Sequence, residues 1–331
     1  MKLLFVFTGG TIGSTMLGDI ISADLEKSYK IIDAYATRHK IDFDYDVCEP
    51  YVELSENNSG VHIKSLVSCI KENLNKGYDG IIVTHGSDTL QYSASAIGYC
   101  VGLETLPICI VASNSPIENL NSNAIDNLQG AISFIKQKLG KGAFVVYRNS
   151  CSRKVEVHRA TRLISSKAYS DEVMSLQGIN YGCFNEDFIF EKNINYFERA
   201  DETEILSVSC LQEQSRNIMV LNAYPGMIYP QIPEEIKYVV LNTYHSGTLN
   251  TKSQSALAFF LKARENNVTV YATGISDGAQ YESAKSFEEL CIVPIKNLSP
   301  ISAYVKLWIL SSMEKDVAEL MQKSICGDIF K

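Results

Sequence analysis

Short runs of consecutive apolar residues recur along the first half of the chain, at residues 3–7, 80–84, 107–111 and 143–147. Runs of this length are typical of strands that are buried on both faces of a sheet. Between them lie segments with apolar residues at helical spacing, namely Leu66, Val67, Ile70 and Leu74, and then Leu120, Ala124, Leu128, Ile132, Ile135 and Leu139. Strands that alternate with helices pair in parallel through right-handed crossovers. The pattern therefore predicts a three-layer α/β domain with a mainly parallel sheet.

A polar, charge-dense stretch at residues 191–216 interrupts this pattern, and we interpret it as a linker. The α/β pattern then resumes, with strands expected near 218–221, 238–241 and 268–272 and helices over 253–264 and 301–321. We therefore expect residues 1–190 to form a larger N-terminal domain. Residues 217–331 should form a smaller, C-terminal parallel α/β domain.

Composition narrows the class of protein. The formal charge of −8 argues against a nucleic-acid surface, which needs clustered lysine and arginine. The nine cysteines contain no CxxC pair and the five histidines lack ligand spacing, so we expect reduced thiols and no metal site. The apolar start is too short for a signal peptide, and no apolar run approaches the roughly 20 residues that cross a bilayer. We expect a cytoplasmic protein without a membrane or nucleic-acid partner.

Two glycine-containing loops follow predicted strands, Thr-Gly-Gly-Thr-Ile-Gly at 8–13 and Thr-His-Gly-Ser-Asp-Thr at 84–89. In an open parallel sheet, ligands bind where strands deliver their carboxyl ends to loops. The first loop can present the Thr11 hydroxyl to a small ligand. The second places Ser87 and Asp88 at a helix start, where unpaired N–H groups favour a negative charge. The alternative is that Ser87 and Asp88 only cap their helix.

Neither loop fits a nucleotide-binding motif. The first loop has glycines at 9, 10 and 13, which is not the GxGxxG spacing of a dinucleotide fingerprint. A phosphate-binding P-loop would end in Gly-Lys-Ser or Gly-Lys-Thr, and neither is present. We therefore expect no nucleotide cofactor.

Taken together and in this order, the two loops resemble the signature loops of the L-asparaginases, and the similarity extends through 54–57 and 110–113. The resemblance implies an amidohydrolase that converts L-asparagine to L-aspartate and ammonia through an acyl-enzyme on Thr11. Ser87 and Asp88 match the positions that activate water or relay a proton. Backbone N–H groups of the second loop would hold the oxyanion.

The resemblance also assigns the residues that bind the substrate. Ser55 and Glu56 match the loop that recognises the amino and carboxylate groups, and the charge of Glu56 suits an α-ammonium. The alternative for Glu56 is a surface carboxylate in a polar loop. Asn57 and Asn58 read as turn residues, and His85 is expected to leave catalysis to its neighbours.

Two positions depart from the family's pattern. Relatives carry a tyrosine on a flap beyond the nucleophile, whereas residues 17–21 read Leu-Gly-Asp-Ile-Ile. Relatives also carry a catalytic lysine where this chain has Ser165. Lys167 lies two residues further on, which in a strand is the same face, so it is the candidate substitute.

Assembly and class remain to be considered. The resemblance implies a homodimer or homotetramer in which a partner's second domain completes each site, and residues 243–248, with His245, are the candidate segment. It implies no metal or organic cofactor. Two other functions stay open: a non-catalytic amino-acid sensor, and the glutaminase subunit of a tRNA-dependent amidotransferase. For the amidohydrolase itself, L-glutamine or another small amide is a possible substrate besides L-asparagine.

Overall fold

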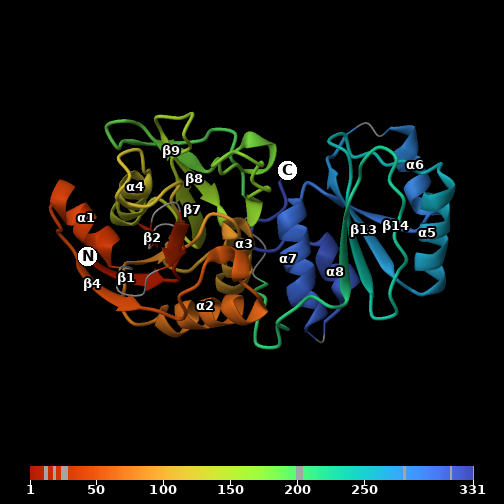
Figure 1. Cartoon of the computed structure of the whole chain (residues 1–331), viewed down its shortest axis with the longest axis horizontal. Coiled ribbons are helices and arrows are strands. Elements are labelled where there is room, and N and C mark those ends of the chain that lie inside the picture. The colour runs from red at the N-terminus through yellow and green to blue at the C-terminus, as the bar shows by residue number, and fades with distance from the viewer. Residues whose placement is uncertain are drawn as a thin grey trace.

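The computed structural model describes residues 1–10, 14–17, 20–23, 29–198, 204–278, 281–313 and 315–330. Two α/β units lie side by side along the long axis of the molecule (Figure 1). The N-terminal unit holds an eight-stranded sheet and the C-terminal unit a four-stranded one. The expected fold class, a larger and mainly parallel first domain with a smaller parallel second domain, is therefore confirmed.

The first sheet has the strand order β10-β9-β8-β7-β6-β5-β1-β4. Its strands are β1 Lys2–Phe7, β4 Asp44–Cys48, β5 Gly80–Thr84, β6 Ile108–Val111, β7 Ala143–Tyr147, β8 Val155–Arg159, β9 Gly182–Phe184 and β10 Phe190–Lys192. The first five of these pair in parallel, while β8, β9 and β10 add an antiparallel edge. A separate antiparallel hairpin pairs β2 Ser14–Leu17 with β3 Ile20–Ala23.

Helices cover both faces of this sheet because successive strand residues point to opposite sides. On one face, Leu3, Phe5 and Phe7 pack with α1 Lys30–Arg38 and α4 Ala124–Lys136. On the other, Leu4 and Val6 pack with α2 Gly60–Asn73 and α3 Leu90–Val101. Short 3₁₀ turns lie at Ser55–Asn57, Ala160–Arg162 and Leu176–Gly178. The predicted three layers are therefore present.

The second sheet is parallel throughout, with β11 Ile218–Asn222, β12 Tyr238–Asn242, β13 Thr269–Ile275 and β14 Ile292–Lys296 in that order. One face packs against α5 Gln254–Glu265 and α6 Glu282–Glu289. The other packs against α7 Pro300–Ser311 and α8 Val317–Gln322. No helix within the described ranges is long and apolar enough to cross a bilayer.

Helix α7 joins the two units. It lies between α3 and the second sheet (Figure 1), and its apolar residues belong to the same continuous core as α2 and α3. Buried polar contacts reinforce this junction: Tyr99 on α3 donates to Asp328 (2.9 Å), and Asp328 pairs with Lys306 on α7 (3.0 Å). The two units therefore share one apolar core.

Three expected elements differ in extent. The helix expected to include Leu120 begins at Ala124, because Leu120 is almost fully exposed in the preceding loop. The helix expected over 301–321 is two helices, since α8 starts afresh with Asp316 as its N-cap. Strand β10 reaches Lys192, so the sheet extends slightly into the stretch that we interpreted as linker.

Candidate active site

The two glycine loops meet at the carboxyl edge of the first sheet. Strands β1 and β5 are neighbours, with Phe7 opposite Thr84, so the loops that follow them leave the sheet side by side. A Cβ atom on Gly10 would lie 2.3 Å from the Gly86 nitrogen and 2.4 Å from Gly86 Cα. The Thr8 hydroxyl also donates to the Thr84 carbonyl (2.8 Å). Glycine at position 10 is thus what allows the two backbones to touch.

The loop predicted to bind substrate joins them. Gly10 N donates to Glu53 O and Glu53 N donates to Thr8 O, both at 3.1 Å. Ser55 is buried and packs on Gly86, where a Cβ atom would lie 2.4 Å from the Ser55 hydroxyl oxygen. The structure therefore brings together the loops of Ser55, of Ser87 and of the residues that precede Thr11.

Thr11 itself lies outside the described residues, so the structure places its neighbour Gly10 instead. The β2–β3 hairpin, which includes part of the segment compared with the family's flap, follows the first loop. The backbones of Ile20 and Ile21 form part of β3, within that hairpin.

Ser87 and Asp88 do not cap helix α3. The helix begins at Leu90, its N-cap residue is Thr89, and the Thr89 side chain makes no capping hydrogen bond. Ser87 is half-buried and Asp88 is exposed. Within the described part of the chain, the side chains of both and the backbone N–H groups of residues 87–89 have no hydrogen-bond partner. Side chains and N–H groups are thus available to a ligand, as an oxyanion site requires.

His85 is buried next to these groups. Its Nδ1 lies 2.8 Å from the Gly86 carbonyl oxygen and its Nε2 lies 3.3 Å from the Asn58 amide nitrogen. Burial lowers the pKa of His85, although the bond to the Gly86 carbonyl opposes that shift. The ring is therefore neutral near pH 7, and both of its nitrogens contact groups inside the protein.

The contacts of Asn58 cannot be predicted from the sequence. It was expected to be a turn residue, but its amide nitrogen reaches both His85 and the Thr89 hydroxyl (3.4 Å). Burial raises the pKa of the neighbouring Tyr51 phenol to about 12. The Tyr51 hydroxyl and Asn58 Oδ1 are buried without a hydrogen-bond partner in the described part of the chain. No spacing or periodicity marks such a residue, because its partners come from another loop.

Glu56 and Lys167 are both exposed. For Glu56, exposure is compatible either with binding an ammonium group or with a surface role. For Lys167 the structure corrects the argument from strand geometry: residues 164–170 form no strand, so Lys167 shares no strand face with Ser165. Its side chain has no hydrogen bond or ion pair to any described residue. His245 is exposed in the turn after β12, as a segment that reaches a partner would be.

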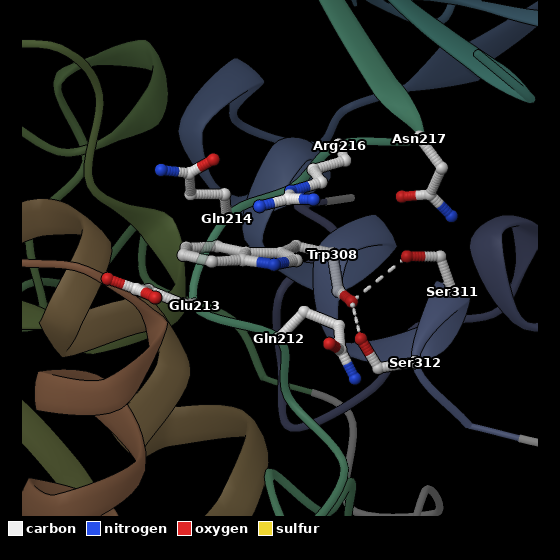
Figure 2. A pocket seen from close by; sticks show the side chains of 8 residues that line it. All are labelled: Gln212, Glu213, Gln214, Arg216, Asn217, Trp308, Ser311 and Ser312. Atoms are coloured by element: carbon white, nitrogen blue, oxygen red, sulfur yellow. Dashed lines mark hydrogen bonds between the residues drawn. The ribbon is translucent and has the colours of Figure 1, made fainter. Parts of the chain in front are cut away.

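Two cavities lie along helix α7. One of about 680 Å³ is lined by Asn58 and Thr89 from the first domain, Ser165, and Tyr304 and Trp308 from α7. The other, of about 430 Å³, has the Trp308 indole of α7 at the centre of Figure 2 and is also lined by Gln212, Glu213, Gln214, Arg216, Asn217, Ser311 and Ser312. Ser87 and Asp88 line neither of these cavities. Among the described residues, no three His, Cys, Asp or Glu side chains gather as metal ligands would.

Comparison with known proteins finds one matching family and several related sequences. The family model described as "Asparaginase, N-terminal" matches residues 2–201. A glutamyl-tRNA(Gln) amidotransferase subunit of Methanococcus maripaludis is 27% identical over 83% of this chain and 68% of its own length. The L-asparaginase of Thermococcus kodakarensis is 25% identical over 99% of both chains.

Solved structures share the fold over the whole chain. The thermostable L-asparaginase from Thermococcus kodakarensis has a TM-score of 0.77 at 20% identity, covering all of both chains. L-asparaginase I from Vibrio cholerae has a TM-score of 0.75 at 19% identity, covering 100% of this chain and 99% of that one. Because the family model spans more than half of the chain, this protein belongs to the asparaginase family and is an amidohydrolase.

Proposed function

We propose that this protein hydrolyses the side-chain amide of L-asparagine to L-aspartate and ammonia, with Thr11 as the nucleophile. The observation that carries the proposal is the junction of three loops at the carboxyl edge of the first sheet, where Gly10, Ser55 and Gly86 touch. Residues 1–190 would be the catalytic domain and residues 217–331 the second domain.

The chemistry proceeds in two steps. The Thr11 oxygen forms a bond to the amide carbon, the carbon–nitrogen bond breaks, and the hydroxyl proton leaves with the nitrogen as ammonia. Water then cleaves the ester and restores Thr11. Ser87 and Asp88 would relay protons and activate the water. The N–H groups of residues 87–89, which have no partner among the described residues, would stabilise the negative charge on the amide oxygen.

The remaining roles concern binding and proton acceptance. Ser55 and Glu56 would bind the amino and carboxylate groups, with Glu56 facing the ammonium. Lys167 would supply the cation that relatives carry at the position of Ser165. A partner's residues 243–248, with His245, would close the site in a homodimer or homotetramer.

L-glutamine is the second candidate substrate, and one observation favours it. Several of the related sequences are named as a subunit of a glutamyl-tRNA(Gln) amidotransferase. One added methylene changes binding by only about 1–3 kcal/mol, so the residues at the site do not choose between the two amides. The sensor alternative is favoured by Ser165 in the lysine position.

The proposal is tested by measuring ammonia release from purified protein with three substrates. These are L-asparagine, L-glutamine and succinamic acid, which is asparagine without its α-amino group. We expect turnover of asparagine, and a lower kcat/KM for succinamic acid because Glu56 loses its partner. Binding of asparagine without ammonia release would instead establish a sensor. Preference for glutamine would establish the second candidate.

A further inference from the structure

The hydrogen bonds around His85 have determined directions. The Gly86 carbonyl oxygen can only accept, so His85 Nδ1 donates to it across 2.8 Å. A neutral imidazole that is protonated on Nδ1 has an unprotonated Nε2, which must then accept. The only donor that the described residues offer there is Asn58 Nδ2, at 3.3 Å.

The other bond of the Asn58 amide agrees with this assignment. The Thr89 hydroxyl donates its proton to the Ser55 carbonyl oxygen (2.8 Å), so its oxygen is left to accept from Asn58 Nδ2 (3.4 Å). Both hydrogens of the Asn58 amide nitrogen are then used, one on His85 and one on Thr89. One chain of hydrogen bonds therefore runs from the Asn58 amide to His85 on one side, and through the Thr89 hydroxyl to the Ser55 carbonyl on the other.

The hydrogen bond from His85 also determines the orientation of the peptide group that joins Gly86 to Ser87. In a trans peptide the carbonyl and the following N–H point in opposite directions, and the described chain has no cis peptide. Holding the Gly86 oxygen on His85 therefore turns the Ser87 N–H away from the histidine. That N–H has no acceptor in the described part of the protein.

We propose that Asn58 is a positioning residue that stabilises His85 in the tautomer that donates to the Gly86 carbonyl, and thereby holds the orientation of the Ser87 N–H toward the reacting amide. Without the Asn58 donor, the proton of His85 can move to Nε2. The lone pair of the unprotonated Nδ1 would then face a lone pair of the Gly86 oxygen, and the two would repel each other. The Gly86–Ser87 peptide group would then rotate, and the Ser87 N–H would no longer point toward the amide oxygen of the substrate. The catalytic consequence rests on the proposed function, whereas the tautomer does not.

Nitrogen NMR of protein labelled with ¹⁵N in its histidines tests the first step, with the His85 signal assigned by its loss in His85→Asn. In the wild type we expect a protonated Nδ1 and an unprotonated Nε2 near neutral pH. A protonated Nε2, or an equal mixture of tautomers, would overturn the proposal without any variant being made.

Variants test the dependence on Asn58. Asn58→Asp offers only acceptors and should shift the proton toward Nε2 or leave the ring doubly protonated, while Asn58→Ala should give a mixture of tautomers. Asn57→Ala is the matched control, because the Asn57 amide bonds Glu53 and not His85 (2.9 Å), and it should keep the wild-type spectrum. An unchanged His85 spectrum in a folded Asn58→Ala protein would show that Asn58 is only a turn residue.

Kinetics test the second step. Asn58→Ala should lower kcat about 10- to 100-fold with little change in KM, as expected when a group acting in the transition state is misplaced. His85→Asn keeps an N–H near the Nδ1 position, so adding Asn58→Ala to it should cost little more, and a full further loss would contradict the link. If the wild type shows the expected tautomer but releases no ammonia, the proposed function fails while the hydrogen-bond assignment stands.

Discussion

Replacing Gly10 by alanine should separate the two catalytic loops. Gly10 has φ +76°, a left-handed conformation that costs a residue with a side chain about 1–2 kcal/mol. The new Cβ atom would also lie 2.3–2.4 Å from backbone atoms of Gly86, which no rotamer change can move. Carbon atoms prefer separations of about 3.5 Å, so the loops must part by about 1 Å.

The magnitudes follow from these two effects. Overpacking typically costs a further 1–3 kcal/mol or so, which gives a total loss of unfolding free energy of about 2–5 kcal/mol. A misplacement of about 1 Å at a reacting centre can cost about 100-fold in rate. Gly10→Ala should therefore lose both stability and turnover.

Gly77→Ala is the matched control. Gly77 has φ +80° but nothing within 4 Å of its Cβ position. It should lose only the backbone contribution, about 1–2 kcal/mol, and keep wild-type turnover. The assay is denaturant unfolding of both variants at neutral pH, followed by ammonia release under conditions where both are folded. Equal losses of stability in the two variants, with wild-type turnover in Gly10→Ala, would refute the close contact between the loops.

Three further predictions concern proton transfer and pH. Ser87→Ala should lower kcat by roughly 10²- to 10⁴-fold while Ser87→Thr stays near wild type, because only the hydroxyl matters; equal rates for serine and alanine would remove Ser87 from the mechanism. Lys167→Ala should lower turnover about 100-fold with substrate binding retained if this exposed lysine serves as the missing cation, and normal kinetics would exclude it. Burial lowers the pKa of His158 from 6.5 to about 4. As the pH falls below 6.5, His158 binds a proton in the unfolded chain before it does so in the folded protein. The contribution of His158 to the free energy of unfolding is therefore full above pH 6.5 and falls by about 3 kcal/mol toward pH 4. Unfolding of wild type and His158→Gln across that range checks this, since the variant should lack that part of the slope.

Much of the fold follows from local pattern. Strands β1, β5, β6 and β7 are predictable because they are buried on both faces and therefore read as unbroken apolar runs. The antiparallel edge was not predicted: β9 and β10 have three residues each, too few for a period to show. The expected long helix ends at Ser311 and Asp316 caps a new one, a break that an apolar stripe alone does not reveal.

Part of the candidate site is likewise predictable from the sequence and part is not. The loops of Gly10 and Ser87 could be placed from sequence because parallel neighbouring strands deliver their loops to one edge. Asn58 could not, since its role depends on His85 and Thr89, which a different strand and turn bring to it. The choice of Lys167 assumed that it lies on the same strand face as Ser165. The segment that contains both residues is irregular, so the two-residue spacing does not place them on one face.

If Thr11 is the nucleophile, it carries the acyl group during turnover, and that intermediate can be trapped. Wild-type protein mixed with L-asparagine would be quenched in acid within one turnover, digested and analysed by mass spectrometry. We expect the peptide containing Thr11 to gain the mass of asparagine minus ammonia, and Thr11→Ala to show neither the adduct nor turnover above about a tenth of the wild-type rate. Ammonia release that persists in Thr11→Ala, with no acyl group on the wild-type peptide, would contradict this expectation.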